Sequence, residues 1–401
     1  GVTITMINNP EGQTDTVKEL ETQFEQNTGA KLNVEVVPPE QVQPKIAAAA
    51  AAGGTQYDVF STDIIFLPQF AAAGWIATLD DHMTPELQND ILPFAKQGTF
   101  YNGHWYGLPG VAEWKNFVYN AAILKDAGFD APPVTWDDLV KQCTAIKAKG
   151  KVQYPLNVSW SQKENLVVDY VAIASAYGAP LFDSKGDPAF NKGDGVTALQ
   201  LMVDLLNKYK CVDPAALAQS GSGAVSDALK AGMAAYGYLW GTPLFDLNDP
   251  AKSKLAGQFK IALAPQGTGP NASPATVAGP EAWVISSGSK NKDAAWQFLK
   301  FFAGPEGATY SFIHSGEPAG WKSVIANPDV AAKLKDAGGD IMAQQQLTAV
   351  NRPSLPYYAE WSAAAQLEFQ NALVGKKTVQ QALDDLATAT AALKAKFTTT
   401  S

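Results

Sequence analysis

Residues 101–120, YNGHWYGLPGVAEWKNFVYN, decide the fold, because they place a turn, a strand end and a second strand close together. Asn102-Gly103 is a strong signal for a two-residue turn, and the aromatic residues on both sides of it suit the strands of a hairpin. Pro109 removes a backbone donor and Gly110 relaxes the backbone, so the strand is predicted to end there. The segment predicts a hairpin followed by a passage into another domain.

An acid and an aromatic residue, Glu113 and Trp114, follow this predicted strand end at once. A carboxylate accepts hydrogen bonds from hydroxyl groups, and an indole offers a broad apolar face. The pair therefore suits a polyhydroxylated ligand such as a sugar.

The composition predicts a large protein with two lobes. The chain has 401 residues, 46% of them hydrophobic, and this length exceeds the size at which one core splits into domains. The formal net charge is -9 and Arg352 is the single arginine, so nucleic acid is not an expected partner. No run approaches the roughly 18 apolar residues that span a bilayer. The chain opens on a predicted strand at Val2, which fits either a cytoplasmic protein or a mature exported one without its leader.

Helix and strand patterns alternate through about the first hundred residues, which predicts an α/β fold with a mostly parallel sheet. Thr16 and Glu19 match a capping box at a helix start, and Gly29 can end that helix in the left-handed region. From residue 114 to 262 the pattern is helix-rich, and it then returns to strands and loops.

The two cysteines, Cys143 and Cys211, match no zinc or redox spacing, so no metal site is expected. Thr135 and Asp138 predict a capped helix start that places Cys143 on a buried face. A disulfide in an oxidising compartment and two free thiols are equal alternatives at this point.

Sequence signatures of enzymes are absent, because the chain has no GxSxG elbow, no HExxH pair and no GxxxxGK[ST] loop. The histidines lie far apart in the sequence and are predicted to be surface or loop residues. No cofactor and no catalytic residue is expected. A carbohydrate-active enzyme is the alternative that an aromatic-rich α/β chain leaves open.

Several segments resemble family 1 extracellular solute-binding proteins, the sugar receptors of ABC importers, which include the maltodextrin-binding proteins. The hairpin NGHWYGLP, then Glu113, then FVYN is similar to the hairpin and first crossover of that family. Further resemblances follow in the family's order at residues 2–8 (VTITMIN), 16–29 (TVKELETQFEQNTG), 31–38 (KLNVEVVP), 57–63 (YDVFSTD), 127–143 (AGFDAPPVTWDDLVKQC), 189–206 (AFNKGDGVTALQLMVDLL) and 285–302 (ISSGSKNKDAAWQFLKFF).

The resemblance implies a two-lobed periplasmic-binding-protein fold, type II-like, with a ligand cleft between lobes joined by hinge segments. It implies an N-terminal lobe of residues 1–112 and 263–315 and a C-terminal lobe of residues 113–262 and 316–401. The implied function is reversible capture of a sugar or polyol and its delivery to the permease of an ABC transporter. The implied protein is a periplasmic or extracellular monomer, and a lipid-anchored precursor is one alternative for its export. A receptor for a non-sugar polar solute is the second alternative.

The resemblance implies ligand contacts from the first lobe at loops that follow strands. Glu11 and Gln13 belong to the loop after the first strand, and Gln43 matches a cleft position where the family more often has an aromatic residue. Asp63 resembles a loop aspartate that accepts sugar hydroxyls, although it could serve as a helix cap instead. Glu113 is the strongest single acid.

Aromatic residues are expected to stack on the faces of a sugar ring. The implied set comprises Trp114 and then, in the second lobe, Trp160, Tyr238 and Trp240. At residues 279–283 the sequence departs from the family, because Glu281 takes the usual tryptophan position and Trp283 is shifted by two. From the last segment the resemblance adds Trp321 and Arg352, the arginine being either a cleft residue or a structural ion-pair partner.

Overall fold

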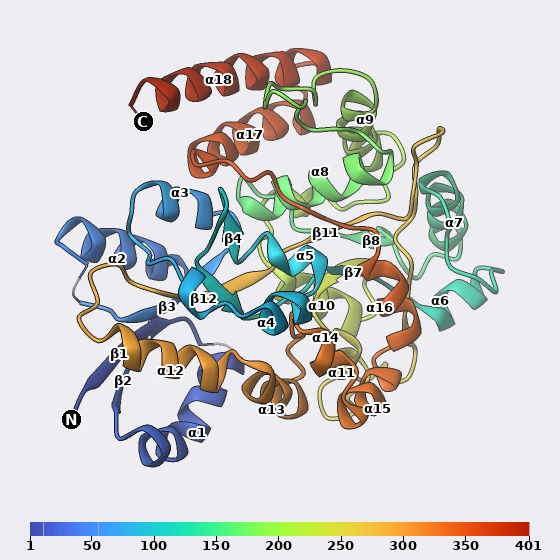
Figure 1. Cartoon of the computed structure of the whole chain (residues 1–401). Helices are drawn as coiled ribbons and strands as arrows, with labels where there is room; N and C mark the ends of the chain where they lie inside the picture. Colours follow the sequence, from blue (N-terminus) through green and yellow to red (C-terminus); the bar gives the residue numbers. More distant parts are fainter. Residues whose placement is uncertain (11, 55, 401) are drawn as a thin grey trace. The chain divides into compact units, whose positions relative to one another are not determined.

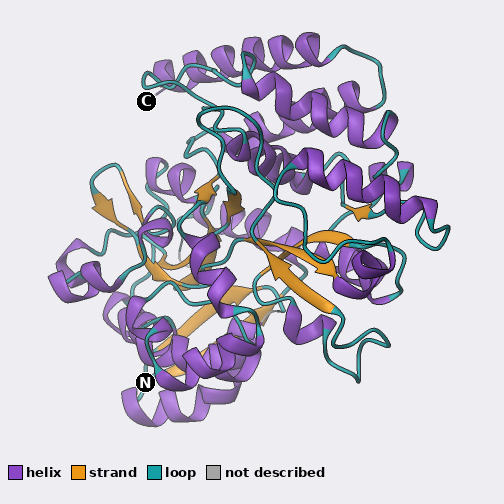
Figure 2. Cartoon of the chain, turned by 90° about the vertical axis from the view of Figure 1, so that its right-hand side faces the viewer, coloured by secondary structure: helices purple, strands orange, loops and turns teal. Residues whose placement is uncertain are grey.

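The computed structural model describes residues 1–10, 12–54 and 56–400, and the chain divides into two compact units. Figure 2 shows the chain as a mixture of helices, strands and connecting loops. Unit 1 comprises Gly1–Glu113, Gly279–Leu334 and Ser354–Pro356, and unit 2 comprises Trp114–Ala278, Lys335–Pro353 and Tyr357–Ser401. The predicted site residue Glu11 lies outside the described residues.

Unit 1 has a mixed helix and strand content, with labels as in Figure 1. Its strands are β1 (Thr3–Asn8), β2 (Lys31–Val36), β3 (Val59–Asp63), β4 (Phe100–Tyr101), β5 (His104–Trp105), β6 (Gly107–Pro109) and β12 (Glu281–Ile285). Its helices are α1 (Gly12–Thr28), α2 (Pro39–Ala51), α3 (Leu67–Ala72), α4 (Pro85–Asp90), α5 (Pro93–Lys96), α12 (Lys292–Phe302), α13 (Pro305–Ser315), α14 (Lys322–Ile325) and α15 (Pro328–Asp336), with a short 3-10 helix at Asp80–His82.

The main sheet of unit 1 has the strand order β2-β1-β3-β12-β6. Strands β1, β2 and β3 are parallel, and β12 runs antiparallel to both β3 and β6. The carboxyl ends of β1, β3 and β6 therefore meet the amino end of β12 along one side of the sheet. We call this side edge 1, and it is formed by Asn8, Asp63, Pro109 and Glu281.

Helices from the two ends of unit 1's sequence pack together. Helix α1 contacts α12 and α13, and α12 contacts β12, so the later helices complete a layer that α1 begins (Figure 1). Phe24 of α1 lies 5.3 Å from Phe302 and 5.9 Å from Phe298, measured between ring centroids. This aromatic cluster fixes α12 to α1 and holds the sheet behind edge 1.

Unit 2 has more helix. Its strands are β7 (Lys115–Asn120), β8 (Leu156–Asn157), β9 (Tyr236–Trp240), β10 (Phe259–Ala262), β11 (Thr276–Ala278) and β13 (Ala349–Asn351). Its helices are α6 (Ala121–Asp126), α7 (Trp136–Ala148), α8 (Glu164–Ala176), α9 (Asp194–Asn207), α10 (Ser222–Lys230), α11 (Leu244–Leu247), α16 (Gly339–Gln346), α17 (Tyr358–Leu373) and α18 (Val379–Thr400), with a short 3-10 helix at Pro214–Leu217.

The main sheet of unit 2 has the order β10-β7-β9-β8. Strand β7 is antiparallel to both β9 and β10, and β8 is parallel to β9. The carboxyl ends of β8, β9 and β10 therefore lie beside the amino end of β7. We call this side edge 2, and it is formed by Lys115, Asn157, Trp240 and Ala262.

Helix α8 forms the centre of a helical layer in unit 2. All of its residues from Leu166 to Ala174 are buried, as expected of a helix that is apolar on nearly every side. Helices α9 and α17 contact α8, and α18 contacts α17 and α9 (Figure 1). Tyr170 of α8 and Phe369 of α17 lie 4.4 Å apart between ring centroids, which ties the C-terminal helices to the layer.

The chain changes units at positions other than those expected. Residues 263–278 belong to unit 2, because β11 pairs with β13 in that unit. Residues 316–334 belong to unit 1, because Ala319 forms a backbone bridge with Val111. Both placements depend on pairings between distant segments, which the Gly and Pro signals in the sequence do not specify.

The hairpin predicted from residues 101–120 is confirmed. Strands β4 and β5 pair with Tyr101 opposite His104. Asn102 and Gly103 have φ angles of 48° and 88°, and two positive φ angles are what a type I′ turn requires. Strand β6 ends at Pro109, as predicted.

Candidate functional site

Two acids lie side by side at edge 1. Asp63 ends β3 and Glu281 begins β12, and the two are register partners on neighbouring antiparallel strands. Both side chains are half-buried. Glu281 Oε2 accepts a hydrogen bond from Ser61 Oγ at 3.0 Å, and Asp63 Oδ1 accepts one from the backbone N–H of Ile65 at 3.2 Å.

This pair of acids is suited to accept hydrogen bonds from hydroxyl groups. A carboxylate has about four lone-pair sites and can accept from several hydroxyl groups at once. Like charges directly opposite each other on adjacent strands also destabilise a sheet. Hydroxyl groups of a ligand that donate to both acids would offset part of that repulsion.

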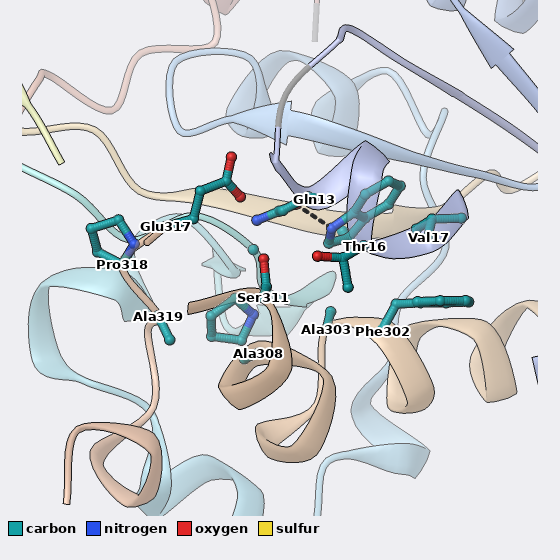
Figure 3. A pocket seen from close by; sticks show the side chains of 13 residues that line it. Gln13, Thr16, Val17, Phe302, Ala303, Ala308, Ser311, Glu317, Pro318 and Ala319 are labelled. Atoms are coloured by element: carbon teal, nitrogen blue, oxygen red, sulfur yellow. Dashed lines mark hydrogen bonds between the residues drawn. The ribbon is translucent and has the colours of Figure 1, made fainter. Parts of the chain in front are cut away.

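Gln13 and Trp283 line a small cavity in unit 1 behind edge 1. The Trp283 indole N–H donates to Gln13 Oε1 at 2.5 Å, and their exposed fractions are 1% and 9%. Figure 3 shows Gln13, Ser311 and Glu317 around the same cavity, whose volume is about 20 Å³. That volume is enough for one water molecule and far below the roughly 300 Å³ of small-ligand pockets. We therefore interpret Gln13 and Trp283 as residues that support edge 1 from behind.

The other predicted residues of unit 1 lie in different surroundings. Glu113 is half-buried, and its carbonyl accepts from the Gly279 N–H at 2.9 Å, where the two segments of unit 1 meet. Gln43 lies on α2, and its Oε1 atom is buried with no hydrogen-bond partner among the described residues. Trp321 is fully buried and donates its indole N–H to the carbonyl of Ala303 at 2.8 Å. Trp321 thus belongs to the core of unit 1.

At edge 2, Trp240 is the aromatic residue with partly exposed surface. It ends β9, is half-buried, and lies opposite Lys115 in the register of β7 and β9. The Lys115 ammonium lies 5.6 Å from the centroid of the Trp240 ring. This cation–π contact fixes one side of the ring, and the exposed part can stack on an apolar ligand face.

A buried ion pair holds Lys115 in place beneath Trp240. Lys115 Nζ lies 2.7 Å from Asp169 Oδ1, and the two side chains are only 5% and 7% exposed. Trp160, itself buried, donates its indole N–H to Asp169 Oδ2 at 2.9 Å. Trp160 therefore acts in this structure by orienting Asp169, and Asp169 orients Lys115.

The remaining aromatic residues predicted for this side pack inside unit 2. Trp114 is buried and donates to Asn116 Oδ1 at 3.1 Å, while Asn116 Nδ2 donates to the carbonyl of Gly241 at 2.7 Å. This chain of bonds holds the residue after Trp240. Tyr238 is buried, and burial together with the charge of Asp169 raises the pKa of its hydroxyl, so it remains a neutral donor.

Arg352 is bound within unit 2 and is 3% exposed. Its Nη1 atom lies 3.0 Å from Glu164 Oε1, and Glu164 also accepts from the hydroxyl groups of Tyr358 at 2.6 Å and Ser362 at 2.5 Å. Of the two alternatives that the sequence leaves for this arginine, the structure favours the ion-pair partner.

We expect Arg352→Met to lower the free energy of unfolding by about 1.5 to 3 kcal/mol, the range for hydrogen bonds to charged groups. Ligand affinity should stay within twofold of the wild type, because the side chain is enclosed in unit 2. Urea unfolding and calorimetric titration measure the two quantities. A large loss of affinity at unchanged stability would indicate that Arg352 contacts the ligand.

The sequence reading missed Lys115 and Asp169, although a signal was present. Asp169 is a lone acid within the apolar run from Leu166 to Ala174 of α8. A charge on a fully buried helix is expensive unless it has a partner, so its position calls for a buried cation. Lys115, directly after Trp114, is that cation.

The described part of the chain contains neither a cluster of metal ligands nor a membrane-spanning helix. No group of three His, Cys, Asp or Glu side chains there is arranged to hold a metal ion. Across residues 1–10, 12–54 and 56–400, no helix combines the length and apolar character needed to cross a membrane.

Comparison with known proteins connects these features to a family. Residues 10–309 match the family described as bacterial extracellular solute-binding protein. A maltotriose-binding protein of Pyrococcus abyssi (strain GE5 / Orsay) is 26% identical over 265 residues, covering 64% of this chain and 52% of that protein.

Two solved structures share the fold over nearly the whole chain. A solute-binding protein of an ABC transporter from Thermotoga lettingae TMO, bound with α-D-tagatose, has a TM-score of 0.84 at 26% identity and covers 97% of this chain and 99% of that one. A maltose-bound protein of T. maritima has a TM-score of 0.86 at 24% identity, with coverage of 98% and 100%. The predicted two-lobed α/β fold is confirmed.

Proposed function

The chain belongs to the family of bacterial extracellular solute-binding proteins, and on that premise we propose that it binds a sugar or a polyol through edges 1 and 2. The similar proteins are named for binding maltotriose, maltose and α-D-tagatose, and none of these names describes an enzyme. Binding here is reversible capture, in which the solute is released unchanged. Delivery to the permease of an ABC transporter follows from the family's role.

The observation that carries the proposal is the chemistry of the two edges. Edge 1 places the carboxylates of Asp63 and Glu281 on neighbouring strands, where they can accept from vicinal hydroxyl groups. Edge 2 offers the partly exposed ring of Trp240, held by Lys115. Hydroxyl acceptors in one unit and an aromatic face in the other match the two kinds of surface that a pyranose or an alditol presents.

Several of the predicted residues join the proposal with defined roles. Asp63, Glu281 and Glu113 are proposed as acceptors for ligand hydroxyl groups, and Trp240 as the stacking ring. Gln13, Trp283, Trp114, Trp160 and Tyr238 are proposed as supports that hold those side chains. Gln43 is proposed as a peripheral contact on α2, as the resemblance implies.

The family acts outside the cytoplasm, by its description. We propose that the protein works there as a monomer. A ligand that binds both units in one closed conformation stabilises that conformation by its differential affinity. The permease is proposed to recognise the closed form.

We expect at least one member of a panel of mono-, di- and oligosaccharides and polyols to raise the melting temperature. A ligand at 100 times its Kd stabilises the folded protein by about 2.7 kcal/mol, which corresponds to roughly 5 to 10 °C for units of this size. Differential scanning fluorimetry reads the shift. Amino acids and inorganic anions form the control panel.

A shift with an amino acid or an anion, and with no carbohydrate or polyol, would contradict the proposed ligand class. The carbohydrate panel is also incubated with the protein and followed by NMR of the sugar signals. Turnover in proportion to the protein concentration would contradict reversible capture and favour the carbohydrate-active enzyme.

A further inference from the structure

The two cysteines of the chain, Cys143 and Cys211, lie against each other in unit 2. Their exposed fractions are 0% and 1%, and the Cys143 side chain is hydrogen-bonded to that of Cys211. In the structure both are free thiols. Two buried thiols in contact are the arrangement from which a disulfide forms without a large movement of the backbone.

Contacts on both sides of the pair hold their two segments together. One helical turn after Cys143, Lys147 Nζ donates to the carbonyl of Tyr209 at 2.9 Å. Gln142, the residue before Cys143, accepts a hydrogen bond from the hydroxyl of Tyr236. Helix α7 is therefore fixed to the segment around residue 211 independently of the sulfur atoms.

The segment that carries Cys211 is itself fixed to the sheet. The Cys211 N–H donates to the carbonyl of Leu205 at 2.9 Å, and the Cys211 carbonyl accepts from the N–H of Leu156 at 2.9 Å. Leu156 is the first residue of β8 and pairs with Tyr236 of β9. Cys143 thus lies on α7, and Cys211 lies on a segment that is hydrogen-bonded to β8, both within unit 2.

We propose that Cys143 and Cys211 are oxidised to an intramolecular disulfide that staples α7 to the sheet of unit 2. The bond forms by thiol–disulfide exchange with a disulfide oxidant, either a small-molecule disulfide or a disulfide oxidoreductase. One cysteine thiolate attacks the oxidant and releases one reduced thiol. The second cysteine then attacks the mixed disulfide and releases the other. Two protons and two electrons pass to the oxidant, whose disulfide becomes two thiols.

The compartment in which this family acts favours disulfide formation. The family is extracellular, and disulfides persist outside the cytoplasm, whereas thiols stay reduced within it. A metal role is disfavoured, because the described residues bring no third ligand to the pair. The inference depends on the family and not on the ligand proposed above.

The oxidation is expected during folding and not afterwards. Burial, followed by the neighbouring Cys211, raises the pKa of the Cys143 thiol, so little thiolate is present in the folded protein. The thiolate is the attacking species, and its access is blocked when α7 is in place. Folded, reduced protein should therefore resist both alkylation and oxidation.

The staple should stabilise unit 2 without changing edge 2. Tyr236, next to the cysteine pair, is the first residue of β9, and Trp240 is the last. The two residues are four positions apart along the strand, roughly 13 Å at about 3.3 Å per residue. The closed loop of about 70 residues is long enough for a large loss of unfolded-state entropy.

The test counts thiols in the full chain after export to an oxidising compartment. The protein is unfolded in guanidinium and treated with a maleimide-polyethylene glycol reagent, with and without prior reduction. We expect no addition without the reductant and two additions after it, and mass spectrometry should find the two cysteine peptides linked. Two reactive thiols in the unreduced sample, a mixed disulfide at each cysteine, or a disulfide-linked dimer would each overturn the proposal.

A second measurement tests the stabilising role. Wild-type protein that is unfolded, reduced and refolded with its thiols kept reduced should melt about 5 to 15 °C below the oxidised protein. The matched control is the double variant Cys143→Ala/Cys211→Ala, whose melting temperature should not respond to the same treatment. An equal response in both proteins would show that the staple contributes nothing. Neither measurement uses a ligand, so both results can be interpreted even if the protein does not bind a sugar.

Discussion

Asp169→Leu is expected to lower the free energy of unfolding by about 3 to 5 kcal/mol, because it leaves a buried cation without its partner. The Lys115 ammonium is 5% exposed and lies 2.7 Å from the Asp169 carboxylate. The variant also removes the acceptor of the Trp160 indole N–H. Urea unfolding followed by far-UV circular dichroism measures the loss.

A double-mutant cycle separates the charge from the packing. Lys115→Met alone should also be destabilising, because it leaves the buried Asp169 carboxylate without its cation. The double variant should recover much of the stability, since replacing both members of a buried pair by apolar residues is often nearly neutral. The free energy of unfolding of the double variant should still be about 1 to 2 kcal/mol below that of the wild type, because the Trp160 N–H remains without an acceptor.

The exposed pair of Lys151 and Asp126 is the matched control. Its atoms lie 3.4 Å apart, and its side chains are 77% and 50% exposed. Removing either charge should cost at most about 1 kcal/mol. If Asp169→Leu were no more destabilising than Asp126→Leu, the ion pair beneath Trp240 would not be buried in solution.

Local signals in the sequence were sufficient to predict several turns and helix ends. The turn at Asn102-Gly103 needs only the φ preferences of those two residues. Likewise, Thr135 and Asp138 form the predicted capping box, with reciprocal hydrogen bonds of 3.1 Å. Contacts between residues no more than four positions apart can be predicted from the local sequence alone.

The same kind of signal was wrong at the start of α1. The box expected at Thr16 and Glu19 does not start a helix, because α1 already begins at Gly12. Thr14 Oγ1 donates to the carbonyl of Asn9 at 2.7 Å and anchors this earlier start to the loop after β1. A pattern match can identify the helix and still miss its first turn.

Part of the proposed site agrees with the topology of the sheets. The resemblance implied Asp63 and Trp240 as ligand contacts, and each ends a strand, the position where ligands gather in open α/β sheets. Trp321 and Trp160 could not be assigned in this way. Whether a tryptophan is buried depends on what faces it. Ala303 lies 18 residues from Trp321, and Asp169 lies 9 residues from Trp160, so neither partner belongs to the same local pattern as its tryptophan.

Trp240→Ala is expected to reduce affinity for the carbohydrate ligand by about 2 to 4 kcal/mol, or roughly 30- to 700-fold, as for aromatic hot spots at binding surfaces. The ring is the partly exposed aromatic surface of edge 2, and no other side chain of that edge offers an apolar face of similar area. Stability should change by only about 1 kcal/mol, because the lost contact with Lys115 is a cation–π interaction.

Calorimetric titration with the ligand found by the thermal screen measures the effect, and two further variants make it specific. Trp240→Phe keeps an aromatic face and should recover most of the affinity. Trp75→Ala removes another half-buried tryptophan, and this one lies at the opposite end of the unit 1 sheet, where Ile76 bridges Ser286 after β12 has ended. Its affinity should equal that of the wild type. Equal losses in Trp75→Ala and Trp240→Ala would mean that affinity follows general stability, and wild-type affinity in Trp240→Ala would remove that ring from the site.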